Sequence, residues 1–314
     1  MKEEKLWEFI RCSLDKDLPL VLLVVVNNTQ GSPGRQGFKM AVNSLGDMEG
    51  TVGGGVMEYK LLRTVREMLT SKEKLPRLLQ QIHDKNAPEN RSGLICAGSQ
   101  EILLCPCYPE TLKLPDRKDF YLNTMILTED GLGFEEKGAS APHLAMYEGS
   151  STGWAYKESL GYENRLYIAG GGHVGLALSK VMASLDFHVT VFDHRPEVKT
   201  ILENSYAHEI IITDFEEIGK IVAEGDNAYV AIVSTNFKTD EAALRALVSK
   251  KLRYLGIMGS AAKLEHLFGI LRNEGYSNET LRKIHAPIGV SIYSRSVEEI
   301  GISIAAELVQ AKNS

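Results

Sequence analysis

The second half of the chain alternates short apolar runs with amphipathic segments, and this alternation constrains the fold more than any other feature. The pattern predicts strands over 166–169, 188–192, 209–212, 228–233 and 254–258. It predicts helices over 174–185, 240–249, 262–273 and 297–312. Such alternation is typical of a parallel, doubly wound sheet with helices on both faces. We therefore predict an α/β chain with a Rossmann-like domain over 164–314.

A glycine fingerprint opens this predicted domain. Gly170, Gly172 and Gly175 match G-x-G-x-x-G directly after the first predicted strand, and Asp193 ends the second strand. In this context the pattern indicates nucleotide binding, because its glycines permit a tight turn, close approach of the backbone to a pyrophosphate, and close helix packing. The alternative is a Rossmann-shaped domain whose nucleotide site has been lost or reused.

Three side chains leave the chemistry of this site open. Asp193 is suited to accept hydrogen bonds from a ribose, whereas Arg195 is suited to meet a phosphate instead. His173 lies inside the loop, where it either contacts a ligand or fills space at the start of the helix.

The first half of the chain predicts a smaller α/β or α+β domain over 1–112. A helix over 3–14, a buried strand over 20–26, a short strand over 38–42, a helix over 56–69 and a strand pair around 93–107 are expected there. The segment 113–163 has a weaker pattern. We predict a connection there, with a hairpin over 121–127 and 132–137 and a loop over 149–153.

Two glycine loops of the first domain, at 31–37 and 50–55, are suited to hold an anionic ligand, because glycine lets the backbone N–H groups approach closely. Arg35 is suited to bidentate contact with a phosphate or a metal-bound oxygen. Lys39 is a second candidate cation, unless it points to solvent from its strand. Glu58 would accept hydrogen bonds from a ligand, or simply be well placed near a helix N-terminus.

Four cysteines, at positions 12, 96, 105 and 107, are too few for a disulfide scaffold, so a cytoplasmic protein with reduced thiols is expected. Cys96 is the candidate metal or sulfur ligand, with a small buried core residue as the alternative. Cys105 and Cys107 form a C-P-C triplet, and no second cysteine or histidine pair lies at zinc spacing.

Four separate blocks of the sequence carry a more specific signal. They read GSPGRQGFKM at 31–40, GTVGGGVME at 50–58, GIMGS at 256–260 followed by Lys263, and HAPIG at 285–289 followed by EEI, SI and AE between 298 and 307. In this order they resemble the XdhC/CoxI family, the accessory proteins of molybdenum hydroxylases such as xanthine dehydrogenase.

The resemblance implies a cofactor chaperone rather than an enzyme. Such a protein binds the molybdenum cofactor, as molybdopterin or its cytosine dinucleotide. It protects the cofactor while a separate cysteine desulfurase supplies sulfur, and it helps insert the cofactor into the hydroxylase. The cofactor-contacting positions it implies are Arg35, Lys39, Gly53, Gly54, Gly55, Glu58, Cys96, Gly170, Gly172, His173, Gly175, Asp193, Arg195, Gly259, Ser260, Lys263 and His285.

The chain also departs from the family pattern. Val56 stands where one branch has cysteine, Asn236 where histidine is frequent, and Ser291 where aspartate is usual. Ala261 and Ala262 replace frequent arginines, which implies a weaker hold on a phosphate or a different ligand.

Net charge and hydropathy exclude other classes. The net charge of −6 argues against non-specific nucleic-acid binding, and no apolar run approaches the ~20 residues of a membrane span. The alternatives to a cofactor chaperone are an NAD(P)-dependent oxidoreductase and a nucleotide-sensing module. A homodimer is expected because symmetric dimers are common.

Overall fold

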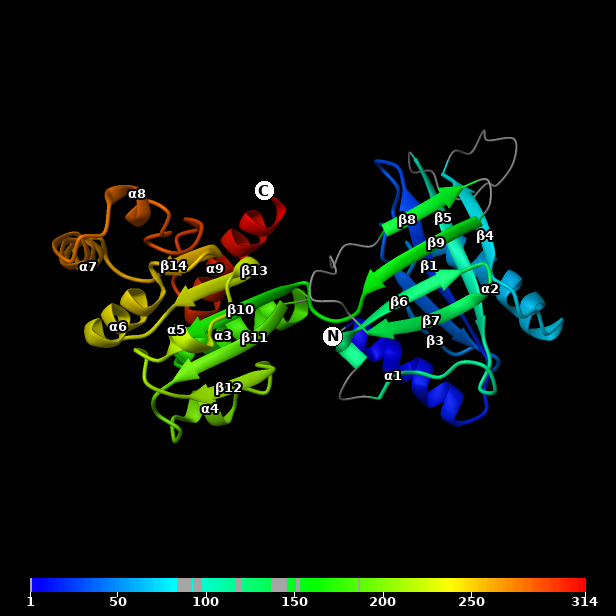
Figure 1. Ribbon diagram of the computed structural model, residues 1–314, viewed down its shortest axis with the longest axis horizontal. Helices are drawn as coiled ribbons and strands as arrows, with labels where there is room; N and C mark the ends of the chain where they lie inside the picture. The colour runs from blue at the N-terminus through cyan, green and yellow to red at the C-terminus, as the bar shows by residue number, and fades with distance from the viewer. Residues whose placement is uncertain are drawn as a thin grey trace. The chain divides into compact units, whose positions relative to one another are not determined.

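The computed structural model describes residues 2–83, 92, 98–116, 120–136, 146–150, 153–185 and 187–314. These residues fall into two units, Met1–Gly161 (unit 1) and Tyr162–Ser314 (unit 2), and each is described by itself (Figure 1).

Unit 1 is built on an antiparallel five-stranded sheet in the order β3-β2-β1-β5-β4. Its elements are α1 (Lys2–Asp15), β1 (Leu20–Asn28), β2 (Lys39–Asn43), β3 (Met48–Gly50), α2 (Gly55–Thr70), β4 (Arg77–Ile82) and β5 (Ser99–Cys107). The expected N-terminal helix, buried strand and second helix are confirmed. Of the strand pair expected around 93–107, residues 93–97 lie outside the described ranges, and β5 pairs with β1 and β4.

The central strand β1 is buried on both faces because its side chains alternate between two cores. Leu20, Leu22 and Val24 pack with α1 on one face. Val21 and Leu23 pack with α2 on the other. An almost uninterrupted apolar run is what such a strand requires.

A second sheet covers the α1 side of the first. It consists of β6 (Asn123–Thr128), β7 (Gly131–Glu136), β8 (Met146–Ser150) and β9 (Gly153–Ser159), in the order β7-β6-β9-β8. The β6–β7 pair matches the expected hairpin. The prediction of a loop over 149–153 is wrong at both ends, because β8 extends to Ser150 and β9 begins at Gly153. Pairing between the two strands outweighs the turn-forming residues there.

A buried ion pair links the two sheets of unit 1. Lys39 Nζ on β2 lies 2.6 Å from Glu158 Oε1 on β9, and only 6% and 12% of these side chains are exposed. Tyr156 donates its hydroxyl to the other carboxylate oxygen at 2.5 Å. Lys39 therefore does not point to solvent.

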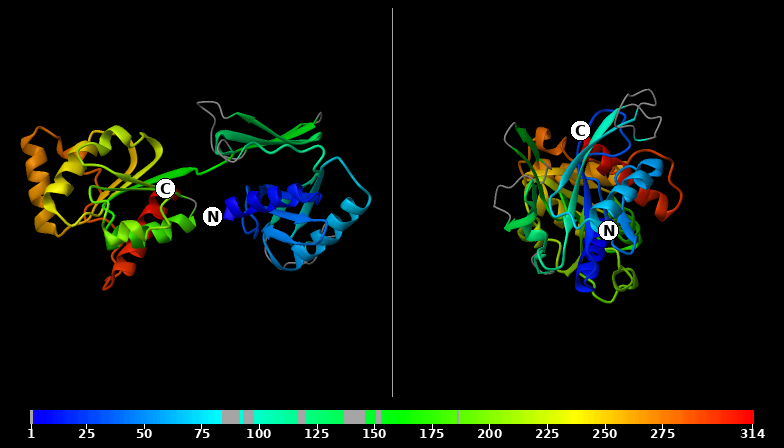
Figure 2. Two further views of the ribbon diagram at one scale, coloured as in Figure 1. Left: turned by 90° about the horizontal axis from the view of Figure 1, so that it is seen from below. Right: turned by 90° about the vertical axis from the view of Figure 1, so that its right-hand side faces the viewer.

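Unit 2 confirms the predicted doubly wound fold, with a parallel sheet in the order β12-β11-β10-β13-β14 (Figure 1). Its elements are β10 (Asn164–Ala169), α3 (His173–Met182), β11 (Phe187–Asp193), α4 (Lys199–Leu202), β12 (Glu209–Ile212), α5 (Ile218–Ile221), β13 (Gly225–Ile232), α6 (Phe237–Leu247), β14 (Leu252–Ile257), α7 (Ala261–Asn273), α8 (Asn278–Leu281) and α9 (Val297–Asn313). Helices α3 and α9 pack on one face of the sheet, and α6 and α7 pack on the other (Figure 2).

The last helix begins at a capping box. The Ser296 side chain accepts from the Glu299 backbone N–H, and the Glu299 side chain accepts from the Ser296 backbone N–H.

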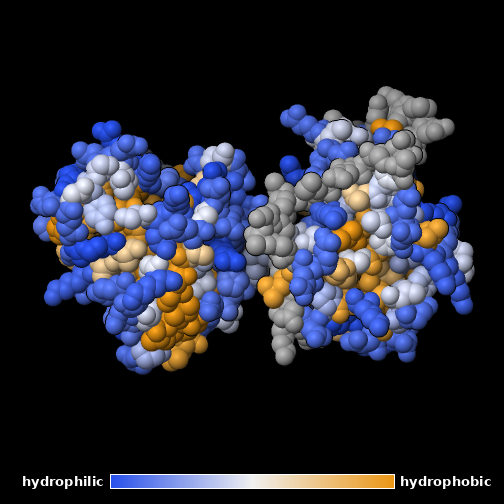
Figure 3. Space-filling model, in the orientation of Figure 1, coloured by the Kyte–Doolittle hydropathy of each residue, from blue (hydrophilic) through white to orange (hydrophobic). Residues whose placement is uncertain are grey.

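Within the described ranges no helix is long and apolar enough to cross a bilayer. The face seen in Figure 3 is mostly hydrophilic, with a few apolar strips.

We expect the Lys39→Met variant to lower the free energy of unfolding of unit 1 by about 3 kcal/mol, because it leaves the Glu158 carboxylate buried without its cation. Urea unfolding followed by tryptophan fluorescence measures this, since Trp7 and Trp154, the two tryptophans of the chain, both lie in unit 1. The matched control is Lys157→Met, which removes an ion pair with Glu135 that is half exposed and should change stability little. Equal effects of the two variants would contradict the structural role of Lys39.

Candidate functional site

The two glycine loops of unit 1 touch each other. A Cβ atom added to Gly53 would lie 2.9 Å from the backbone nitrogen of Gly34, and one added to Gly34 would overlap the carbonyl oxygen of Val52. These contacts exclude any larger residue. The loops at 31–37 and 50–55 therefore form one continuous surface.

A buried amide holds the two loops together. Gln100 Oε1 accepts from the Gly34 backbone N–H at 3.1 Å and from the Ser32 hydroxyl at 2.8 Å. Gln100 Nε2 donates to the Val52 carbonyl at 2.8 Å, and the residue is 1% exposed. Gln100 was not predicted from the sequence. Gln100 lies in the polar start of β5, between Ser99 and Glu101, so no local pattern singles it out.

His83 completes the buried polar cluster beneath the loops. Its Nε2 lies 3.2 Å from Ser32 Oγ, and its Nδ1 lies 2.8 Å from Ser92 Oγ. Burial lowers the pKa of His83 because it disfavours the charged imidazolium, although the hydrogen bond with Gln100 acts the other way.

Glu58 shapes the second loop. Its Oε1 accepts from the Thr51 hydroxyl at 2.6 Å and from the backbone N–H groups of Val52 and Gly54, both at 2.9 Å. This oxygen is therefore engaged within the protein. Through this oxygen the carboxylate fixes the loop at the first turn of α2.

One cation remains available on this surface. The Arg35 side chain is exposed and makes no hydrogen bond or ion pair within the residues that the structure describes. Gly54, with φ of +81°, presents bare backbone, because a Cβ atom there would meet open space. The two loops touch at Gly34 and Gly53. Arg35 is the next residue along the first loop, and Gly54 is the next along the second. An exposed arginine on one loop and uncrowded backbone at the start of α2 on the other are groups that suit an anionic ligand.

The cysteines form no metal site in the described part of the chain. Cys96 lies outside the described residues. Cys105 and Cys107 are buried, and the pKa of the Cys107 thiol is raised well above its ordinary value by the neighbouring Cys105 and by burial. A thiol with a raised pKa stays protonated and is a poor metal ligand. No group of three metal-ligating side chains occurs among the described residues.

In unit 2 the three glycines of the fingerprint serve different purposes. A Cβ atom on Gly170, whose φ is +122°, would lie 2.8 Å from the Ser234 backbone nitrogen. One on Gly175 would overlap the Gly170 carbonyl oxygen. A Cβ atom on Gly172 would meet nothing within 4 Å. The outer glycines are thus required by packing, whereas Gly172 leaves the N-terminus of α3 open to a ligand. His173, the first residue of that helix, is exposed.

Asp193 is fully buried and saturated with donors. Its Oδ2 accepts from the Gly171 N–H at 2.8 Å and from Arg195 Nη2 at 3.0 Å. Its Oδ1 accepts from the Arg195 N–H at 3.0 Å and Nε at 2.9 Å. Burial alone would raise the pKa of this carboxyl, but the hydrogen bonds from Arg195 and Gly171 outweigh burial and hold the pKa below its ordinary value.

The candidate site residues that follow β14, the fifth strand of unit 2, are engaged in the fold. Ser260 caps α7 by accepting from the Lys263 backbone N–H, and Gly259 packs against Leu264. The Lys263 ammonium pairs with the buried Asp240 carboxylate, which was not predicted from the sequence. Asp240 also accepts from the Ser234 hydroxyl at 2.5 Å.

His285 belongs to a separate cluster beside β14. Its Nδ1 lies 2.8 Å from Glu307 Oε1, and its ring stacks on Tyr254 at 4.2 Å. Glu307 also accepts from the Tyr254 hydroxyl at 2.7 Å and from the Gly289 backbone N–H. The HAPIG block and the distant Glu307 are thus one structural unit, which lies alongside β14 through the Gly256–His285 bridge.

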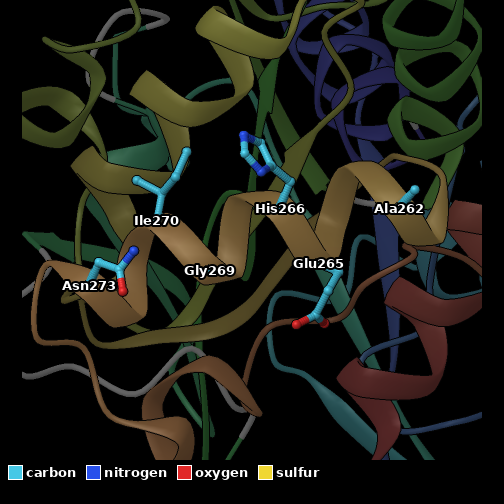
Figure 4. Close-up of a pocket in the computed structure, with 6 residues that line it drawn as sticks. All are labelled: Ala262, Glu265, His266, Gly269, Ile270 and Asn273. Carbon is cyan, nitrogen blue, oxygen red and sulfur yellow. The ribbon is translucent and has the colours of Figure 1, made fainter.

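Positions that depart from the family pattern have structural roles or face solvent. Asn236 caps α6 by accepting from the Lys238 N–H at 2.9 Å. Ala261 and Ala262 are exposed at the start of α7. A shallow groove runs along α7 past Ala262 and His266 (Figure 4). It is lined by none of the expected site residues.

The fold and loops define a protein with a Rossmann-type unit and an antiparallel glycine-loop unit. The family model for the XdhC Rossmann domain matches residues 166–308, and that of the XdhC and CoxI family matches residues 13–80. Together these matches cover more than half of the chain. The chain belongs to the XdhC and CoxI family.

Two curated proteins are similar to this chain. "Uncharacterized protein YqeB" of Escherichia coli K12 is 25% identical over 302 residues, which are 95% of this chain and 44% of that protein. A probable xanthine dehydrogenase subunit of Bacillus subtilis 168 is 24% identical over 148 residues, which are 47% of this chain and 43% of that protein. The chain spans less than half the length of these relatives.

A solved structure shares the fold. It is a crystal structure described as a xanthine dehydrogenase from Bacillus halodurans, with a TM-score of 0.71 and 23% identity. The match covers 98% of this chain and 95% of that one.

We expect the Gln100→Leu variant to lower the free energy of unfolding of unit 1 by about 2 kcal/mol or more, because the Gly34 N–H and the Val52 carbonyl lose their buried partner. Urea unfolding with tryptophan fluorescence measures the loss. The control is Gln80→Leu, an exposed position on the neighbouring strand β4. If both variants unfold at the same urea concentration, Gln100 does not hold the loops together.

The lowered pKa of His83 predicts a pH dependence. The unfolded state takes up a proton as the pH falls through about 6.5, whereas the folded state resists protonation until a lower pH. Stability of unit 1 is therefore fully present above pH 6.5 and declines as the pH falls below it. Urea unfolding between pH 7.5 and 5 should show a flatter profile for His83→Gln than for the unmodified protein. Parallel profiles would exclude His83 as the source.

Proposed function

We propose that this chain is an accessory protein that binds the molybdenum cofactor on the glycine-loop surface of unit 1 and assists its insertion into a xanthine-dehydrogenase-type hydroxylase. The observation that carries the proposal is the contact between the two loops at Gly34 and Gly53, because the next residue along each loop is the exposed Arg35 or the uncrowded Gly54. Membership of the XdhC and CoxI family supports an accessory role, as do the xanthine dehydrogenase names of two similar proteins.

The residues of this surface fit the chemistry of the cofactor. Its phosphate and metal-bound oxygens are anionic, so they require a fixed cation and N–H donors. Arg35 provides the cation, and its planar fork suits bidentate contact with such oxygens. The first turn of α2 provides backbone donors from Gly55 onward, since the N–H groups of Gly53 and Gly54 already donate to Thr51 and Glu58. When bound, the cofactor supplies the molybdenum and dithiolene chemistry of the hydroxylase.

In this proposal the protein holds and shields the molybdenum cofactor and does not react with it. Gln100 and Glu58 keep the two loops in one geometry with no ligand present. A preformed surface of this kind binds without a large ordering cost. Lys39 has no part in our proposal for binding, because removing it from Glu158 would break a buried ion pair. In this proposal a separate cysteine desulfurase supplies the terminal sulfur.

A second candidate function rests on a different observation. The open space at Gly172 favours a nucleotide at the start of α3, as in an NAD(P)-dependent oxidoreductase or a nucleotide-sensing module. This function and cofactor carriage involve different units, so one chain can have both.

The test is pterin retention. Protein is expressed in a host that makes the cofactor, purified without oxygen and denatured, and the oxidised pterin is measured by fluorescence per chain. We expect about one pterin per chain for the unmodified protein and at least tenfold less for Arg35→Ala, because the variant loses a charge-assisted contact. The matched control is Arg63→Ala, which removes an exposed arginine of α2 that pairs with Glu67.

Two results would contradict the proposal. One is the absence of pterin in the unmodified protein, also after incubation with released cofactor. The other is equal retention by Arg35→Ala and Arg63→Ala, which would place the binding surface elsewhere. Activation of an apo-hydroxylase by the loaded protein then tests delivery separately from binding.

A further inference from the structure

The Asp193 carboxylate has no capacity left for a ligand. Each carboxylate oxygen offers about two acceptor directions, and each already accepts two hydrogen bonds. In dinucleotide-binding Rossmann domains an acidic residue at the end of the second strand accepts from the ribose hydroxyls. Asp193 occupies that place, at the end of β11, but here it cannot accept from a ribose unless Arg195 moves away.

Arg195 has donors to spare. A guanidinium carries five N–H groups, and Asp193 takes only two from the side chain of Arg195. The side chain is 40% exposed, and its other three N–H groups have no hydrogen-bond partner among the described residues. His194, also 40% exposed, lies beside the same carboxylate, with Nδ1 3.6 Å from Asp193 Oδ1. This end of β11 therefore offers the spare N–H donors of Arg195, whereas the Asp193 carboxylate has no acceptor left. The exposed Glu197 also lies near enough to raise the pKa of Arg195.

The neighbouring loop is fixed in a position that suits a phosphorylated ligand. Gly171 donates to Asp193, and its carbonyl accepts from the Thr200 hydroxyl at 2.5 Å. A Cβ atom on Gly171 would overlap the Ile201 side chain, so this peptide is locked. Space remains at Gly172, where a pyrophosphate can approach the backbone. Arg195 lies at the end of the adjacent strand, where the ribose of such a ligand is expected.

We infer that unit 2 takes a nucleotide whose adenosine ribose carries a 2′-phosphate, and that Arg195 selects this phosphate over the free 2′-hydroxyl. The Asp193–Arg195 pair converts a site for accepting ribose hydroxyls into a site for donating to a phosphate monoester. Arginine binds such a group bidentately, with the geometry that a planar fork provides. Asp193 acts as a positioning residue that holds the guanidinium, and it does not touch the ligand.

The experiment compares two nucleotides that differ by a single phosphate. The full chain is titrated with 2′,5′-ADP and with 5′-AMP in a calorimeter, at one ionic strength. We expect 2′,5′-ADP to bind at least about tenfold more tightly, because hydrogen bonds to a charged group are gained. NADP⁺ should likewise bind more tightly than NAD⁺. Inorganic phosphate should compete weakly, which separates recognition of the nucleotide from simple anion binding.

Variants test whether Arg195 is responsible. Arg195→Ala should reduce the affinity ratio to one or below, because Asp193 is then free to accept from a ribose. Arg195→Lys keeps the charge without the fork, so it should give an intermediate ratio. Arg272→Ala, which removes an exposed arginine of α7, is the control and should leave the ratio unchanged.

Two outcomes overturn the inference independently of how well the variants fold. Equal affinity of the unmodified protein for 2′,5′-ADP and 5′-AMP would refute selection by the phosphate. Failure of both nucleotides to bind would refute a nucleotide site in unit 2. Neither result affects pterin retention by unit 1, so the two proposals fail separately.

Discussion

Contact between two stretches of backbone, with no room for a Cβ atom, determines the form of both glycine regions. In unit 1 a Cβ atom on Gly53 would lie 2.9 Å from the Gly34 backbone nitrogen. In unit 2 a Cβ atom on Gly170 would lie 2.8 Å from the Ser234 backbone nitrogen. Most glycines of the two motifs are therefore required by the fold before any ligand is considered. The groups that remain for a ligand are few: the side chains of Arg35 and Arg195, and the open backbone at Gly54 and Gly172. A glycine motif by itself does not distinguish these two uses, whereas the space around each glycine does.

Pairing separates the cations that hold the fold from those that a ligand can reach. Lys39 and Lys263 each face a largely buried carboxylate, Glu158 and Asp240 respectively. Withdrawing either lysine toward a ligand would take from that buried carboxylate the ammonium group it pairs with, which is strongly unfavourable. Arg35 has no carboxylate partner within the described residues. Three N–H groups of the Arg195 guanidinium remain after it binds Asp193. The identity of a basic residue in a motif thus says less about ligand binding than its neighbours do.

Much of unit 2 could be predicted from the sequence because its signals are local. Apolar runs, helix periodicity and the glycine turn all lie within short windows, and the order of elements then implies a parallel sheet. In unit 1, β4 and the β8–β9 hairpin were not predicted, since these polar strands depend on partners in the sheet. The site residues divide in the same way. Gln100 contacts a loop 66 positions away and Glu158 a lysine 119 positions away, and no local pattern indicates such partners.

The Glu307 carboxylate gathers three groups from two other segments: Tyr254 on β14, and His285 and the backbone of Gly289 in the HAPIG segment. All three precede it in the chain. During synthesis on the ribosome, β14 and the HAPIG segment therefore emerge before the carboxylate that fixes them. Until residue 307 has left the exit tunnel and α9 has docked, the segment beside β14 lacks its anchor. The final geometry of unit 2 is in this sense a late event in its biogenesis, set by a side chain near the end of the last helix.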